Sequence, residues 1–145
     1  MNMLKEIQKE YLLIALGLSI FIAICFYLVQ SNIFLLSGNY QYILTKLVPM
    51  SIVIGLSASF YFGNKHLKIA KSAKKSDAKI NSFTKALRIK NACLLIPGII
   101  AGLSAVVSGE TQFLFIALAI LIVILIAFPT KVKSISAMEI SDKNF

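Results

Sequence analysis

Two charged residues, Lys46 and Glu110, stand far along the chain from the other charges around them. Lys46 is the only charged residue between positions 11 and 62, and most of its neighbours are apolar. Burying an unpaired charge is costly, so a lysine in such a run either has a function or reaches water with its long stem. Three interpretations follow for Lys46: an ammonium exposed at a helix end, an ion pair with Glu110, or a ligand or ion site.

The other reactive side chains show no catalytic or metal-binding pattern. His66 is the single histidine, and no second histidine or carboxylate stands near it at the spacing of metal ligands. Cys25 and Cys93 lie within apolar runs, which is typical of small buried hydrophobic residues. The chain has no phosphate loop and no dinucleotide fingerprint. We therefore expect a protein that is not an enzyme, with no catalytic residue, no metal and no cofactor.

Small residues recur at every fourth position in two apolar segments. They are Ser51, Gly55 and Ser59 in the first segment, and Gly98 and Gly102 in the second. Residues four apart lie on one face of a helix, and small side chains there let two helix backbones approach closely. We expect the two small-residue faces to pack against each other within one chain. An interface between two copies of the chain is the alternative.

The chain that carries these residues is too apolar for an ordinary soluble domain. Apolar residues make up 58% and charged residues 14% of the sequence, against roughly 45–50% and 25% in soluble proteins. Four runs with at most one charge approach the roughly 20 residues needed to cross a hydrocarbon core. These predicted spans cover about 11–29, 42–62, 91–107 and 112–128. The sequence predicts an all-α integral membrane four-helix bundle that forms a single domain over 1–145.

Most of the net charge of +9 comes from one loop. Nine of the 15 basic residues lie between Lys65 and Lys90, whereas the predicted outer connections 30–41 and 108–111 contain none. Cytoplasmic loops of membrane proteins are rich in Lys and Arg. We therefore expect the loop 64–90, both termini and the tail 130–145 on the cytoplasmic side of an inner membrane. This distribution also argues against nucleic-acid binding.

Apolar residues within the basic loop recur at helical spacing, with lysines on the other faces. They form a candidate docking stripe for a partner protein, consisting of Ile69, Ala73, Ile80, Phe83 and Leu87. Phe83 is the largest of them and is the expected anchor. Without a partner, the loop would still set the topology and contact anionic lipid head groups.

The same spacing predicts that the basic loop is a helical hairpin. We expect the second helix to continue to about Ser72, and the third to start between Asp77 and Phe83. The hairpin would then extend from the membrane into the cytoplasm. In the alternative, Gly63-Asn64 ends the second helix early and leaves the stripe as a separate helix at the membrane interface.

The overall layout carries a family resemblance. Its elements are the basic loop before the third span, Phe128-Pro129-Thr130-Lys131 at the end of the fourth, and an acidic-hydrophobic tail around Met138-Glu139-Ile140. On these points the chain resembles small, uncharacterised four-span membrane proteins of Bacteroidota-type bacteria, which implies a multi-pass protein but no particular activity. It differs from the small multidrug exporters, whose proton-coupling glutamate in the first span has no counterpart in 11–29.

These features predict a non-enzymatic accessory or scaffold subunit. Its expected partners are the lipid bilayer, anionic head groups through the basic loop, and a partner protein or further copies of itself. The alternative is a small oligomeric channel or transporter, which needs a polar path through the membrane. The residues available for such a path are Lys46, Ser51, Ser57, Ser59, Ser104 and Gln112.

Overall fold

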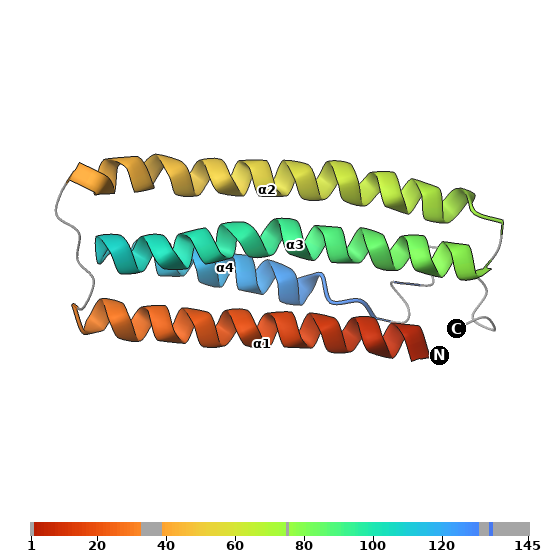
Figure 1. Ribbon diagram of the computed structural model, residues 1–145, viewed down its shortest axis with the longest axis horizontal. Helices are drawn as coiled ribbons and strands as arrows, with labels where there is room; N and C mark the ends of the chain where they lie inside the picture. The colour runs from red at the N-terminus through yellow and green to blue at the C-terminus, as the bar shows by residue number, and fades with distance from the viewer. Residues whose placement is uncertain (1, 33–38, 75, 131–133, 135–145) are drawn as a thin grey trace.

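The computed structural model describes residues 2–32, 39–74, 76–130 and 134, and within these ranges it has four helices and no strand (Figure 1). The helices are α1 (Asn2–Gln30), α2 (Asn39–Ser72), α3 (Ser76–Ser108) and α4 (Gln112–Ile126). This confirms the predicted all-α class. Lys131 and the tail around Met138-Glu139-Ile140 lie outside the described residues.

Three of the helices are long and apolar enough to cross a membrane: Lys5–Gln30 of α1, Gln41–Ser72 of α2 and Asp77–Ser108 of α3. The fourth, α4, has 15 residues, or about 22 Å at 1.5 Å per residue. It ends two residues before the end of the predicted span, at Ile126. The reason is local: the N–H of Phe128 donates to the carbonyl of Leu125 at 3.1 Å, and Pro129 has no N–H to continue the helix.

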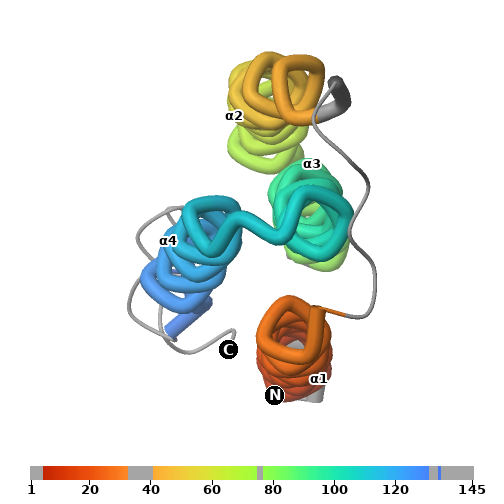
Figure 2. Tube along the Cα trace, turned by 90° about the vertical axis from the view of Figure 1, so that its left-hand side faces the viewer, coloured from red at the N-terminus to blue at the C-terminus, as the bar shows by residue number. Residues whose placement is uncertain are grey.

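The bundle is organised around α3. This helix packs against each of the other three, and α1 also packs against α4. In contrast, α2 packs chiefly along α3, on the side away from α1 (Figure 2). Large hydrophobic side chains therefore remain exposed along α2, among them Tyr42, Ile54 and Phe60.

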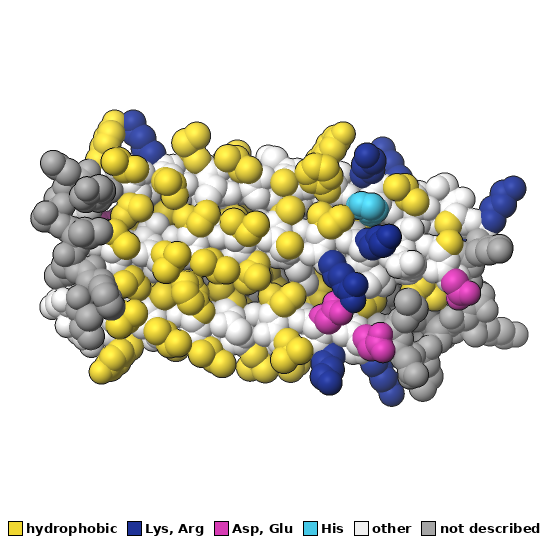
Figure 3. All heavy atoms as spheres, in the orientation of Figure 1, with side chains coloured by type: hydrophobic (Ala, Val, Ile, Leu, Met, Phe, Trp, Pro, Cys, Tyr) yellow, Lys and Arg dark blue, Asp and Glu magenta, His cyan; other side chains and the backbone are white. Residues whose placement is uncertain are grey.

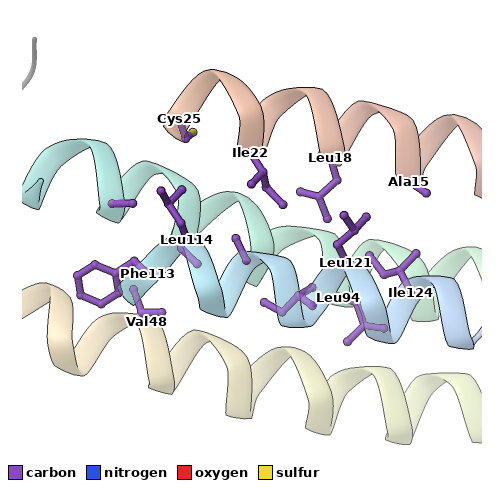
Figure 4. Close-up of a cluster of buried hydrophobic side chains, with 14 of the residues drawn as sticks. Ala15, Leu18, Ile22, Cys25, Val48, Leu94, Phe113, Leu114, Leu121 and Ile124 are labelled. Atoms are coloured by element: carbon purple, nitrogen blue, oxygen red, sulfur yellow. The ribbon is translucent and has the colours of Figure 1, made fainter. Parts of the chain in front are cut away.

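The main hydrophobic core lies between α1, α3 and α4. Leu18 and Ile22 of α1 point toward Leu121 and the neighbouring core residues (Figure 4), and all three side chains are buried. Val48 is the fully buried contribution of α2, and it lies beside Phe113 at the start of α4 (Figure 4). This core packs α4 against α1 and α3 despite the short length of α4.

A helical hairpin extends beyond the core, as the spacing of the basic loop predicted. α2 passes through Gly63 and Asn64 without a break and ends at Ser72, as predicted, and α3 begins at Ser76, one residue before the predicted range. The alternative in which Gly63-Asn64 ends the second helix is therefore wrong. The last turn of α2 is closed by the Ser72 hydroxyl and the Ala73 N–H, which both donate to the carbonyl of Ile69. The N-terminus and this turn lie at the same end of the molecule (Figure 1).

Candidate functional site

Several apolar residues of the hairpin pack between its two helices. Phe83 of α3 is only 5% exposed and packs with Ala70 of α2, which is 1% exposed. Three partly buried residues complete this contact, which we call the hairpin seam: Leu67, Ile80 and Leu87. The prediction that Phe83 anchors a docking stripe is wrong, because α2 itself covers that side chain.

The remaining stripe residues do not form an exposed face either. Ile69 is 45% exposed and Ala73 is partly buried, but neither belongs to the hairpin seam. Ile69 directly precedes Ala70, and neighbouring helical residues point about 100° apart. Ile69 therefore faces away from the seam, and the stripe Ile69, Ala73, Ile80, Phe83 and Leu87 is split between two faces.

Since the seam takes most of the large apolar residues, the hairpin presents chiefly basic side chains to its surroundings. The exposed ones are Lys65, Lys68, Lys71, Lys74, Lys85 and Arg88, while Lys79 and Lys90 are partly buried. In Figure 3 most charged side chains gather at the end of the molecule that holds the N-terminus and the hairpin, and hydrophobic side chains are spread over much of the rest of this face. The two halves of the molecule thus offer a cationic surface and an apolar surface.

An ion pair joins α3 to α1 where the charged end begins. Arg88 donates through Nε to Glu10 at 2.9 Å and through its terminal nitrogen to the other carboxylate oxygen at 2.5 Å. This two-point geometry matches the planar guanidinium to the carboxylate. Sequence reasoning missed the pair, because nothing local connects residues 78 positions apart. The only available signal was that both lie just outside predicted spans.

The first turns of α1 also hold the end of α4. The side-chain amide of Gln8 donates to the carbonyl of Pro129 at 2.9 Å. One turn further, the rings of Tyr11 and Phe128 meet edge to face, with centroids 6.1 Å apart. Pro129 follows the end of α4, so its carbonyl has no partner within that helix. Gln8 supplies the missing hydrogen-bond donor.

The small residues of α2 lie against α3. A Cβ added at Gly55 would lie 2.5 Å from the carbonyl oxygen of Cys93 and 2.6 Å from Cγ of Pro97. Pro97 has no N–H, so it leaves that carbonyl, four residues before it, without its helical donor. The backbone of Gly55 lies close to this carbonyl oxygen of Cys93. On the same face Ser59 is buried, and the hydroxyl of Ser51 donates to the carbonyl of Val48.

The small residues of α3 do not face α2, and the prediction that the two small-residue faces pack together is wrong. A Cβ added at Gly98 would lie 3.4–3.5 Å from side-chain atoms of Ile120 and Leu18. One added at Gly102 would lie 2.5 Å from the ring of Phe21, again on α1. The cause is helical rotation: Pro97 faces α2, and the next residue points about 100° away.

The residues considered for an outer ion pair have other partners. The ammonium of Lys46 donates to the hydroxyl of Tyr42 at 2.5 Å, one turn earlier on α2. The carboxylate of Glu110 accepts from the side-chain amide of Gln112, and its backbone N–H donates to the hydroxyl of Ser108. Within the described ranges Lys46 and Glu110 form no ion pair, because each finds a partner in its own segment.

Three of the polar residues considered for a membrane path bond locally through their side chains. Lys46 and Gln112 are engaged as described, and the hydroxyl of Ser51 bonds within its own helix. Ser104 is buried, and its carbonyl accepts from the hydroxyl of Ser108 at 2.7 Å. Ser57 is exposed on α2. These contacts give no positive argument for a polar path.

Among the residues that the structure describes, no three His, Cys, Asp or Glu side chains gather as metal ligands would. The chain matches no protein-family model, no curated protein and no solved structure.

Proposed function

We propose that the chain is a four-span inner-membrane protein with both termini and the hairpin in the cytoplasm. In this proposal it is a non-enzymatic accessory or scaffold subunit, and its basic hairpin binds the anionic surface of the membrane. A partner protein or further copies of the chain would contact the exposed apolar surface of α2 within the bilayer.

One observation carries the proposal: most of the charges and most of the exposed apolar side chains occupy opposite parts of the molecule (Figure 3). Since Phe83 and its neighbours are buried in the hairpin seam, the surface of the hairpin is chiefly cationic. Each basic residue near an anionic membrane contributes about 1 kcal/mol of attraction. A set of exposed lysines therefore supports contact with lipid head groups more directly than docking through an apolar anchor.

A membrane crossing by α4 is also part of the proposal. Its 15 residues supply about 22 Å, and the hydrocarbon core is about 30 Å thick. The non-helical residues Ala127 to Pro129 continue the chain toward the charged end, by at most about 3.3 Å per residue. The amide of Gln8 meets the carbonyl of Pro129 there, which supports an end of the crossing at that level.

Cysteine labelling tests the orientation. In a background with Cys25→Ala and Cys93→Ala, single cysteines would be introduced as Thr111→Cys and Lys74→Cys, which are both exposed positions. A membrane-impermeant maleimide should label position 111 on intact cells and position 74 only after permeabilisation. The reverse pattern would overturn the proposed topology.

Lipid preference tests the hairpin. The protein would be purified in mild detergent with equal amounts of phosphatidylglycerol and phosphatidylcholine, and retained lipids counted by native mass spectrometry. Replacing Lys65, Lys68 and Lys74 by glutamine should reduce the preference for phosphatidylglycerol, more strongly at low salt, because exposed charges are screened. Lys46→Gln, which removes a single charge at the other end, is the control and should retain the preference. Equal loss in both variants would count against the hairpin.

The subunit role is tested by the proteins that co-purify in mild detergent. A stable complex with a second protein would support an accessory or scaffold role. Purification only as an oligomer of this chain, together with solute flux in vesicles, would instead support the channel or transporter alternative.

A further inference from the structure

A small cavity lies where the hairpin meets the apolar half of the molecule. Its volume is about 170 Å³, and its walls come from α2, from α3 and from the segment that follows α4. Most of the lining is apolar, including Leu67, Leu87 and Phe128. Two polar residues also line it, Lys90 and Ser134. The lining therefore combines apolar side chains with one lysine and one serine.

The stem of Lys90 packs against α2 at a glycine, Gly63. A Cβ added at Gly63 would lie 2.7 Å from Cγ and 3.0 Å from Cδ of Lys90, and it would also contact Cε. Only a residue without a side chain leaves room for the lysine to cross here. The packed stem has already lost part of the rotamer freedom that an exposed lysine would lose on binding a ligand.

The ammonium group of Lys90 has no partner among the described residues. It forms no hydrogen bond or ion pair with any residue in the described part of the chain, although Arg88, two residues earlier, is paired with Glu10. Lys90 is also partly buried, which favours a ligand that supplies negative charge.

Ser134 provides the second, independent observation. The residue is fully buried, and its hydroxyl oxygen has no hydrogen-bond partner, whereas its backbone N–H donates to the carbonyl of Thr130 at 2.9 Å. A buried hydroxyl without a partner is destabilising. An acceptor atom in the cavity would relieve that cost, and phosphate oxygens are strong acceptors.

The cavity lies at the level expected for lipid head groups. Lys90 directly precedes the uncharged segment 91–107, Gly63 directly follows the apolar segment 42–62, and Phe128 ends the segment 112–128. In a bilayer these three boundaries coincide with the edge of the hydrocarbon core. Basic pockets between helices on the cytoplasmic side are a known form of phospholipid site.

We infer that this cavity is a specific site for an anionic phospholipid, which rests on the membrane placement proposed above. The phosphate binds Lys90 and accepts a hydrogen bond from Ser134, and the first methylene groups of an acyl chain lie against Leu67, Leu87 and Phe128. Surface lysines of the hairpin attract anionic lipid in general, but this site retains one molecule.

The test compares two lysine variants of equal charge change. Lys90→Gln alters the cavity, and Lys85→Gln alters an exposed hairpin lysine that does not line it. Phosphatidylglycerol would be titrated into the delipidated protein in detergent and followed by native mass spectrometry. We expect Lys90→Gln to weaken the first binding step about tenfold, because it removes a charge-assisted hydrogen bond, and Lys85→Gln to weaken it no more than about twofold.

Two further variants separate the site from general electrostatics. Gly63→Ala keeps every charge but displaces the Lys90 stem, and Ser134→Ala removes only the hydroxyl; both should weaken the first step. Circular dichroism and thermal unfolding check that the helices persist. Inorganic phosphate at the same concentration should not displace the lipid, because it lacks the acyl chain.

Equal effects of Lys90→Gln and Lys85→Gln would overturn the specific site and leave the proposed cationic hairpin standing. Displacement by inorganic phosphate would overturn the assignment to a lipid. Reversed cysteine labelling at positions 74 and 111 is a separate result, which would overturn the membrane orientation itself.

Discussion

The contact between α2 and α3 is built differently in the two halves of the molecule. In the apolar half it depends on a missing side chain: Gly55 lies against the backbone of Cys93 and the ring of Pro97. In the hairpin it depends on a large side chain: Phe83 is buried against Ala70. The same two helices thus use a small residue at one end and an aromatic residue at the other.

The proposed membrane placement gives this difference a physical reason. In lipid, apolar side chains gain little by leaving their solvent, so helices associate through close backbone contact and packing. In water, burying an aromatic ring is itself strongly favourable. The change from one kind of contact to the other occurs near Gly63, where the stem of Lys90 crosses α2. This supports placing the edge of the membrane at that level.

The largest expected effect is the loss of the aromatic ring in the hairpin. Phe83→Ala should destabilise the hairpin by about 3–5 kcal/mol, as a large cavity replaces a buried ring. Hydrogen exchange should show loss of amide protection in Lys65–Ser72 and Asp77–Leu87, while the apolar half stays protected. Phe60→Ala is the matched control, because Phe60 is exposed on α2. Similar exchange in the two variants would mean that the hairpin does not depend on its seam.

The next effect is expected at Gly55. A leucine side chain there meets a backbone oxygen that cannot rotate away, and overpacking of this kind typically costs about 1–3 kcal/mol. Gly55→Leu should therefore lower the thermal unfolding temperature in detergent. Gly17→Leu is the control, since a Cβ added at Gly17 meets nothing within 4 Å. An unchanged melting temperature for both would show that α2 does not pack closely on α3.

A smaller effect is expected where α3 meets α1. The Cβ of Gly102→Ala would meet the ring of Phe21 and the sulfur of Cys25. These are side-chain atoms, which can shift more easily than a backbone carbonyl. We expect a loss of about 1 kcal/mol, measured by thermal unfolding beside Gly55→Ala. A larger loss at Gly102 than at Gly55 would contradict this ranking, which is based on the kind of atom encountered.

Local patterns predicted the elements but not their partners. Hydropathy and helical spacing act within a few turns, so the four helices and the continuous hairpin could be read from the sequence. Which face of α3 meets which helix depends on rotation about its axis. Cys93 and Pro97 face α2, whereas Gly98 points toward α1 and α4 and Gly102 toward α1. Residue spacing alone does not distinguish these faces.

In the candidate site, too, local patterns were predicted and contacts between distant residues were not. The spacing of Ile80, Phe83 and Leu87 correctly marked an apolar face, but it did not show that α2 would cover it. The cavity at Lys90 was not predicted at all, because it combines Gly63, Lys90 and Ser134 from three distant parts of the chain. The one signal of this cavity in the sequence was the position of Lys90, directly before an uncharged run.

The smallest expected effect concerns the ion pair at the border between the two halves. Arg88 and Glu10 meet at two points, but their side chains are 60% and 40% exposed. Exposed pairs contribute only about 0.2–1 kcal/mol, because water and salt screen the charges. Glu10→Gln should therefore lower the melting temperature slightly, and the difference from the wild type should shrink as salt is added.

Glu6→Gln is the control for this pair, since it makes the same charge change one turn earlier without removing the two-point contact. Comparing Glu10→Gln with Glu6→Gln shows whether the Arg88–Glu10 pair lies in water or in the low-dielectric region. If the pair lies in water, Glu10→Gln behaves as an exposed pair and its effect fades with salt. If the pair lies in the low-dielectric region, the unpaired Arg88 becomes costly, and the loss exceeds that of Gly102→Ala and persists at high salt. The second outcome would move the membrane edge about one turn toward the hairpin and place Lys90 below the head groups, against the proposed lipid site.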